Sequence, residues 1–304
     1  MLSLRIPDFD PDLVYQSRQL VDWRRVGPRW YIIYNQDKAC SIKRYGEKIV
    51  FYCNEEDFFN IWYKQLSLDL NLLTLPHKLL GVDTLMTDML STHYKLRPIR
   101  MPLEEAIIKS CLLVKDIQGY QFRDILGSLY SVCGTMRAYT IPNMGRIQWT
   151  ACPTLRTLQC FRGTMYSVLF PRDAENLICQ IGDMVNSDEL RLAEALPAEE
   201  AEGWLRQHIP VLTEEQIDHI MLSVYCDISR CPQYYLSEPA QSLYGISAQS
   251  LKEWFEPETK DIIGMIGLAC SAANTEGRLF VNKLIQKNGS CLLTKLKKEA
   301  KKWA

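Results

Sequence analysis

The sequence lacks any long apolar run, and it carries almost no excess charge of either sign. No stretch approaches the roughly 20 apolar residues that a bilayer-spanning helix needs. The formal net charge is −1, so the chain as a whole exerts little pull on nucleic acid or on an anionic membrane. Residues 1–10 turn acidic too soon for a signal peptide, and we therefore expect a cytoplasmic protein without membrane contact.

The sequence also lacks the short motifs that usually mark a cofactor site or a nucleophile. It has no glycine-rich phosphate loop of either standard type, and no serine or cysteine in a recognisable nucleophile elbow. Cys226 and Cys231 lie close together, but no second pair completes zinc spacing, and the four histidines are dispersed. We expect no metal and no cofactor. The odd number of cysteines, 11, favours buried free thiols in a reducing compartment.

Aromatic and β-branched residues dominate three short runs, at residues 29–34, 39–44 and 48–53. Polar turn residues separate these runs, which predicts an antiparallel meander. Asn54 follows, and three acids then occupy the expected first turn of a helix, where the helix dipole favours negative charge. We therefore predict a helix that Asn54 caps.

Beyond residue 98 the apolar residues repeat at helical spacing. Pro102 suits a helix start, Gly119 separates two apolar stripes, and Gly134 suits the end of the second stripe. Later helices are predicted at residues 173–185, 188–195, 198–207, 213–226, 248–255, 259–273 and 278–288. The sequence therefore predicts an α+β protein, with an N-terminal antiparallel sheet domain at residues 1–98 and a larger helical domain at residues 99–304.

Two local basic segments are candidates for contact with phosphate groups. One is the set Arg24, Arg25, Arg29, Lys43 and Arg44, and the other is the lysine-rich stretch at residues 294–304. A solvated strand surface is the simpler explanation of the first segment, and a solvated helix end is the simpler explanation of the second. Both explanations stay open at this point.

The order of elements resembles that of a known family. Residues 54–70 begin with three acids after Asn54, carry their aromatic residues at positions 58–63, and end in Leu-Ser-Leu-Asp-Leu. This helix resembles one in the N-terminal domain of the 8-oxoguanine DNA glycosylases, where a helix capped by acids precedes a segment of the type Tyr-Phe-Asp-Leu-Asp. Upstream, Gln19 and Trp23 resemble the family's Gly-Gln-x-Phe-Arg-Trp stretch.

The resemblance continues downstream of the sheet. Ile99 and Arg100, with the helix predicted at residues 103–114, are similar to the segment that opens the family's helical domain. Residues 151–154, followed by Leu158, are similar to the family's Phe-Pro-Thr-x-x-x-Leu. These similar segments follow one another in the same order as in the family, and together they span most of the chain.

The resemblance implies a helix-hairpin-helix DNA glycosylase architecture, a role in base excision repair, and binding of double-stranded DNA or of a modified base. Such enzymes flip a base out of the duplex and cut its glycosidic bond. The family's hairpin is a Gly-x-Gly turn that presents backbone N–H groups to a phosphate. A lysine on the next helix acts as an amine nucleophile, and an aspartate after a Pro-Val promotes the reaction.

Residues 209–222 match that hairpin and its second helix. Asp218 stands in the place of an aspartate that the family carries on this helix. The hairpin glycines are replaced, one by Val211 or Leu212 and the other by Thr213. The resemblance therefore predicts a hairpin between two helices at these residues, but the family's hairpin glycines are absent.

Both catalytic positions of the family are also substituted. Glu215 stands where the lysine should be, and Tyr234 stands where the aspartate should be. A carboxylate cannot form a Schiff base. No lysine lies anywhere from residue 206 to residue 230, so a shift of one or two positions does not restore the amine.

Positions that contact the base or the duplex in the family depart as well. Arg18 replaces the glycine before Gln19 in the base-recognition stretch. Asp116 falls near the asparagine that fills the gap left by a flipped base, and its charge would repel phosphate. Tyr166 can serve as the wedge aromatic, but Ser167 replaces the neighbouring arginine.

Three functions stay open on these residues. The first is a degenerate glycosylase relative without lyase activity, which binds DNA, a nucleoside-like ligand or a protein partner. The second is an active monofunctional DNA N-glycosylase in which a carboxylate, Glu215 rather than Asp218, activates water. The third is an unrelated α+β interaction module. The net charge of −1 fits the first and third better, because duplex binding usually needs a basic face.

Overall fold

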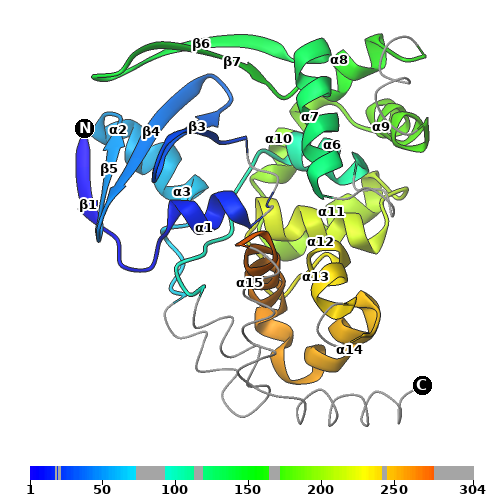
Figure 1. Cartoon of the computed structure of the whole chain (residues 1–304). Helices are drawn as coiled ribbons and strands as arrows, with labels where there is room; N and C mark the ends of the chain where they lie inside the picture. The colour runs from blue at the N-terminus through cyan, green and yellow to red at the C-terminus, as the bar shows by residue number, and fades with distance from the viewer. Residues whose placement is uncertain are drawn as a thin grey trace. The chain divides into compact units, whose positions relative to one another are not determined.

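The chain forms two compact units, and each is described by itself (Figure 1). The computed structural model describes residues 1–17, 19, 22–72, 93–112, 119–163, 172–241 and 245–276. The first unit comprises Met1–Ile6, Leu20–Ser67 and Ile99–Cys226, and the second comprises Pro7–Gln19, Leu68–Pro98 and Asp227–Ala304. The domain boundary expected at residue 98 stays a prediction.

A five-stranded antiparallel sheet lies in the first unit, with the strand order β1-β5-β4-β3-β2. Its strands are β1 (Leu2–Arg5), β2 (Arg24–Gly27), β3 (Trp30–Asn35), β4 (Lys38–Tyr45) and β5 (Lys48–Tyr52). The predicted meander is confirmed as β3, β4 and β5. The two outer strands were not expected, because β1 is only four residues long and β2 is mostly exposed.

The predicted cap at Asn54 is confirmed. Its side-chain oxygen accepts a hydrogen bond from the backbone N–H of Asp57 at 2.6 Å. The helix that follows has three parts, α2 (Glu55–Asp57), the π-helical turn η1 (Phe58–Trp62) and α3 (Tyr63–Gln65). Phe58 packs edge-on against Phe51 of the sheet, with ring centroids 4.8 Å apart. An apolar face at helical spacing therefore anchors this helix on the sheet.

The helical part of the first unit follows the predicted apolar periodicity. Its helices are α6 (Leu103–Leu112), α7 (Gly119–Cys133), α8 (Leu155–Cys160), α9 (Arg172–Met184), α10 (Ser187–Glu194), α11 (Ala198–His208) and α12 (Glu214–Val224). Their buried faces share one hydrophobic core. In that core α6 packs against α9, α10 and α12. The α+β class predicted from the sequence is confirmed.

A β-hairpin between α7 and α8 was not predicted. It consists of β6 (Thr135–Ile141) and β7 (Gly145–Ala151), and Figure 1 shows it as a long two-stranded ribbon. Asn143 and Gly145 have φ angles of 64° and 90°, a backbone conformation that asparagine and glycine tolerate best. Ile141 packs with Ile32 and Ala39, and this contact fixes the hairpin on the sheet.

The second unit is built around α15. Its helices are α1 (Pro11–Gln16), α13 (Gln233–Pro239), α14 (Ala248–Thr259), the 3₁₀ turn η4 (Lys260–Ile262) and α15 (Ile263–Glu276). The buried guanidinium of Arg97 pairs with Asp8 and donates to the carbonyl of Leu70 at 2.9 Å. The helix expected at residues 278–288 lies outside the described residues. No helix in the described ranges is long and apolar enough to cross a membrane.

Candidate functional site

The hairpin between α11 and α12 carries four of the nine site residues expected from the sequence. Residues 209–213 connect the two helices in a tight turn. The N–H of Leu212 donates to the carbonyl of Ile209 at 3.1 Å, and both side chains are buried in the core. Val211 lies between them and is half-buried. Two apolar anchors therefore fix the path of the turn.

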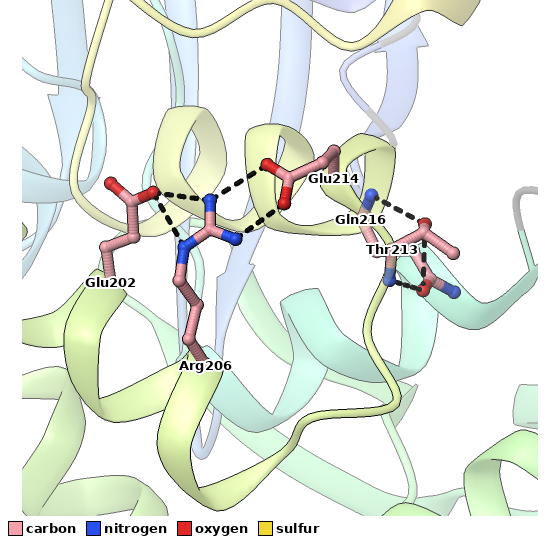
Figure 2. Close-up of polar contacts among 5 residues, drawn as sticks. All are labelled: Glu202, Arg206, Thr213, Glu214 and Gln216. Carbon is pink, nitrogen blue, oxygen red and sulfur yellow. Dashed lines mark hydrogen bonds and ion pairs between the residues drawn. The ribbon is translucent and has the colours of Figure 1, made fainter.

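Thr213 ends this turn as the N-cap of α12. Its N–H donates to the side-chain oxygen of Gln216 at 2.8 Å, while its hydroxyl accepts from the N–H of Gln216 at 3.4 Å (Figure 2). This reciprocal pair is a capping box. Thr213 has φ −78°, which any residue adopts, so the position needs no glycine. The residue that the resemblance places at the second hairpin glycine, Thr213, thus has a side chain that caps the helix.

Arg206 joins α11 to the start of α12. Its guanidinium contacts the Glu214 carboxylate through two nitrogens, at 2.5 and 2.8 Å, and the Glu202 carboxylate at 2.8 Å (Figure 2). These hydrogen bonds raise the pKa of Arg206. Two carboxylates thus hold one cation, and Glu215 adds a third carboxylate in the first turn of α12. The mouth of the hairpin therefore has an excess of negative charge, which opposes phosphate binding.

Glu215 and Asp218 lie one turn apart along α12. Glu215 is in the first turn and half-buried, whereas Asp218 faces the buried side of the helix. The structure thus brings Val211, Thr213, Glu215 and Asp218 together on one hairpin. Their functional roles stay predictions.

The remaining expected site residues lie elsewhere. Gln19 belongs to the second unit, where its buried amide donates to the Ser17 hydroxyl and to the Arg97 carbonyl, both at 2.8 Å. Tyr234 lies on α13 of the same unit, and its ring centroid is 4.1 Å from that of Tyr235. The other three expected residues, Arg18, Asp116 and Tyr166, lie outside the described residues.

A buried lysine on α6 was missed by the sequence reasoning. The Lys109 ammonium lies 2.6 Å from a Glu105 oxygen and 3.2 Å from an Asp22 oxygen, and only 1% of its side chain is exposed. Burial alone would lower its pKa, but the two carboxylates raise it above the usual value, so this lysine stays charged. A signal existed: Lys109 interrupts the apolar run at residues 106–112.

His219 on α12, the second helix of the hairpin, interacts electrostatically with Lys109. Burial, and after it the positive charge of Lys109, lowers the pKa of His219 to about 3. The imidazole is therefore neutral throughout the physiological range, and it does not act as a proton donor near neutral pH.

Metal and disulfide chemistry find no support in the part of the chain that the structure describes. That part contains no group of three or more His, Cys, Asp or Glu side chains arranged to hold a metal ion. Ten of the cysteines fall within it, most of them buried, and none is in a disulfide.

Several solved structures resemble this chain over nearly its whole length. An 8-oxoguanine glycosylase/lyase from Clostridium acetobutylicum, in complex with double-stranded DNA containing cytosine opposite 8-oxoguanine, gives a TM-score of 0.72 at 17% identity. It covers 89% of this chain and 93% of its own chain. MBOgg1 in complex with a low-affinity DNA ligand gives 0.73 at 13% identity, and the coverages are 93% and 95%.

A third similar structure comes from another glycosylase class. The 3-methyladenine DNA glycosylase from Archaeoglobus fulgidus gives a TM-score of 0.68 at 13% identity, with coverages of 89% and 97%. No protein-family model and no curated protein sequence matches the chain. At these identities the likeness concerns the fold, and the chain has the fold of the DNA glycosylases. The fold is therefore not the unrelated one that the third alternative expected, and the interaction function of that alternative stays untested.

Proposed function

We propose that this protein binds DNA or a modified base on a DNA glycosylase fold, without the amine-dependent lyase reaction. The proposal is supported by the hairpin mouth, where the family resemblance expects a lysine and the chain has Glu215, next in sequence to the Glu214 that pairs with Arg206. A carboxylate forms no Schiff base, and a guanidinium held by two carboxylates stays protonated.

The buried lysine does not supply the missing nucleophile. A nucleophilic lysine needs a lowered pKa, so that part of the amine is neutral at working pH. Asp22 and Glu105 have the opposite effect on Lys109, whose pKa is raised. Its side chain is also almost fully enclosed, with 1% of it exposed.

The basic surface of β2 is a better candidate for phosphate contact than the acidic hairpin. Arg24 and Arg25 are exposed on β2, and Arg29 is exposed in the turn that leads to β3. Three exposed guanidinium groups suit phosphate oxygens, and they give binding that weakens as salt rises. We expect weak duplex binding of this kind rather than tight recognition.

Fluorescence anisotropy with intact and lesion-containing duplexes tests the binding. Affinity should fall steeply between about 50 and 200 mM salt, and Arg25→Gln should weaken binding while Lys48→Gln, an exposed control on β5, should not. Absence of binding to every duplex at the lower salt concentration would remove DNA as the partner. Strand cleavage by the purified protein would remove the non-lyase assignment.

A second candidate is a monofunctional N-glycosylase that uses Glu215 to activate water. It is favoured by the placement of Glu215 in the first turn of α12, where the side chain is half-buried. Base release from a panel of damaged duplexes should then disappear in Glu215→Gln and persist in Glu214→Gln. Equal release by both variants would exclude Glu215 as the base.

A further inference from the structure

A cavity of about 210 Å³ lies in the first unit, among β3, α6, α10 and the β6–β7 hairpin. Its lining includes the aromatic side chains Trp23, Tyr34 and Trp149 and the charged side chains Asp22, Glu105, Lys109 and Arg137. The residues of the α11–α12 hairpin do not contribute to it. Drug-sized ligands usually occupy about 300–1,000 Å³, so this cavity suits a smaller molecule, such as a single nucleobase.

One end of the cavity presents a carboxylate that a buried cation holds in place. Lys109 is enclosed, but 34% of the Asp22 side chain remains exposed. Two other lining carboxylates already bind backbone N–H groups, since Glu104 accepts from Leu155 at 2.9 Å and Glu194 accepts from Leu103 at 2.8 Å. Asp22 is therefore the carboxylate best placed to meet a ligand, and a carboxylate accepts two adjacent N–H donors at once.

The wall of the cavity is aromatic. The rings of Tyr34 and Trp149 stack, with centroids 5.1 Å apart and planes 24° apart. The indole N–H of Trp23 is buried and has no hydrogen-bond acceptor among the described residues. Because buried donors usually have an acceptor and Trp23 lines the cavity, a polar group of a ligand is a candidate acceptor for this N–H. A flat heteroaromatic ring with a carbonyl group matches such a wall.

The rim of the cavity carries an exposed arginine. Arg137 lies directly across from Trp149 in the β6–β7 ladder, and among the described residues its guanidinium has no ion pair or hydrogen bond. Arg24 adds a second positive charge nearby. Burial raises the pKa of the cavity-lining Tyr34 overall, and the charge of Arg24 acts to lower that pKa. A planar guanidinium at the mouth of a base-sized cavity suits a phosphate group.

We propose that this cavity binds a guanine nucleoside monophosphate, with the base on Asp22 and the aromatic wall and the phosphate on Arg137. Guanine presents two adjacent N–H donors beside a carbonyl oxygen, which the other three common bases do not. The site goes beyond the duplex binding proposed above and does not rest on it, because no residue of the α11–α12 hairpin takes part.

Calorimetric titration of the full chain with guanosine, adenosine, cytidine and uridine monophosphates, and with inorganic phosphate, tests the proposal. Guanosine monophosphate should bind saturably and most tightly. Arg137→Gln should weaken it by about tenfold, the loss expected for one charge-assisted hydrogen bond. Arg146→Gln, an exposed arginine on the same hairpin outside the cavity lining, should leave it unchanged.

Asp22→Asn tests the base edge separately. This variant should lose the preference for guanosine monophosphate over the other nucleotides. A thermal melt checks that the variant folds. If Asp22→Asn does not fold, Arg137→Gln still tests the site. The proposal is overturned by absence of saturable binding, by equal binding of all four nucleotides, or by phosphate alone binding as tightly. Equal losses in Arg137→Gln and Arg146→Gln also overturn it. Because no DNA is present, these outcomes are independent of the duplex-binding result.

Discussion

The mouth of the α11–α12 hairpin and the cavity beside α6 use their charges in different ways. At the hairpin mouth the charges are exposed and satisfy one another, since Arg206 is held by Glu202 and Glu214. In the cavity the cation is buried, whereas Asp22 and Arg137 retain exposed surface. The side chains at a family's motif position are therefore not necessarily the side chains that can still bind a ligand.

The buried lysine should show the largest effect. Lys109→Met removes the cation between two carboxylates and should lower the free energy of unfolding by about 3–5 kcal/mol, measured by urea denaturation. Lys48→Met, an exposed control, should change it by less than about 0.5 kcal/mol. Similar losses in both variants would contradict a buried ion cluster at the cavity.

His219 makes stability depend on pH. Its pKa is about 3 in the folded protein, below the ordinary 6.5, so the unfolded chain binds the proton first. Stability is therefore complete above pH 6.5 and falls between pH 6.5 and 3, by about 1.4 kcal/mol for each pH unit.

A non-titrating variant isolates this effect. His219→Asn should have a shallower fall in unfolding free energy over the same pH range, measured by urea titrations at several pH values. Glu105 acts in the opposite direction, because burial raises its pKa, so only the difference between the two proteins is informative. Parallel pH profiles would show that His219 is not buried as a neutral group.

The helix cap at the hairpin should have a smaller effect. Thr213→Ala removes the hydroxyl that accepts from Gln216, and it should cost about 1 kcal/mol of stability in chemical denaturation. Gln207→Ala, an exposed change on α11, is the matched control and should be nearly neutral. If Thr213→Ala left the stability unchanged, the Thr213 hydroxyl would not contribute to capping α12.

The exposed ion pair should have the smallest effect. Arg206 and Glu214 are 43% and 70% exposed, so Arg206→Gln should cost less than about 1 kcal/mol, and raised salt should shrink the difference. A double-mutant cycle with Glu214→Gln measures the pair directly. A coupling as large as the effect of Lys109→Met would abolish the contrast between the two regions.

Local patterns in the sequence predicted the elements that have one clearly apolar face. The strands β3 to β5, the Asn54 cap and the amphipathic helices α9 to α12 belong to this group. The β6–β7 hairpin was missed because most of β6 is exposed, which weakens the alternation of apolar and polar residues. Asn143 and Gly145 at its turn were the available signal.

The α11–α12 hairpin could be located from sequence, whereas the cavity could not, and the role of the hairpin as a site stays a prediction. The hairpin residues lie within one short segment, and a family resemblance identified that segment. Asp22, Lys109 and Trp149 are far apart in the chain and meet only because the sheet, α6 and β7 pack together. Even so, a lysine with a glutamate four residues before it, inside an apolar helix, indicated a buried ion pair.

The most direct test of the central claim is borohydride trapping on duplexes that carry damaged bases. A lyase that acts through an amine forms a Schiff base with the opened sugar, and borohydride converts it into a stable protein–DNA adduct. Because the resemblance places Glu215 where the family has its lysine, and Lys109 is held protonated, we predict no adduct on any duplex, including duplexes that the protein binds. An adduct that peptide mapping assigns to a lysine of this chain would contradict the account.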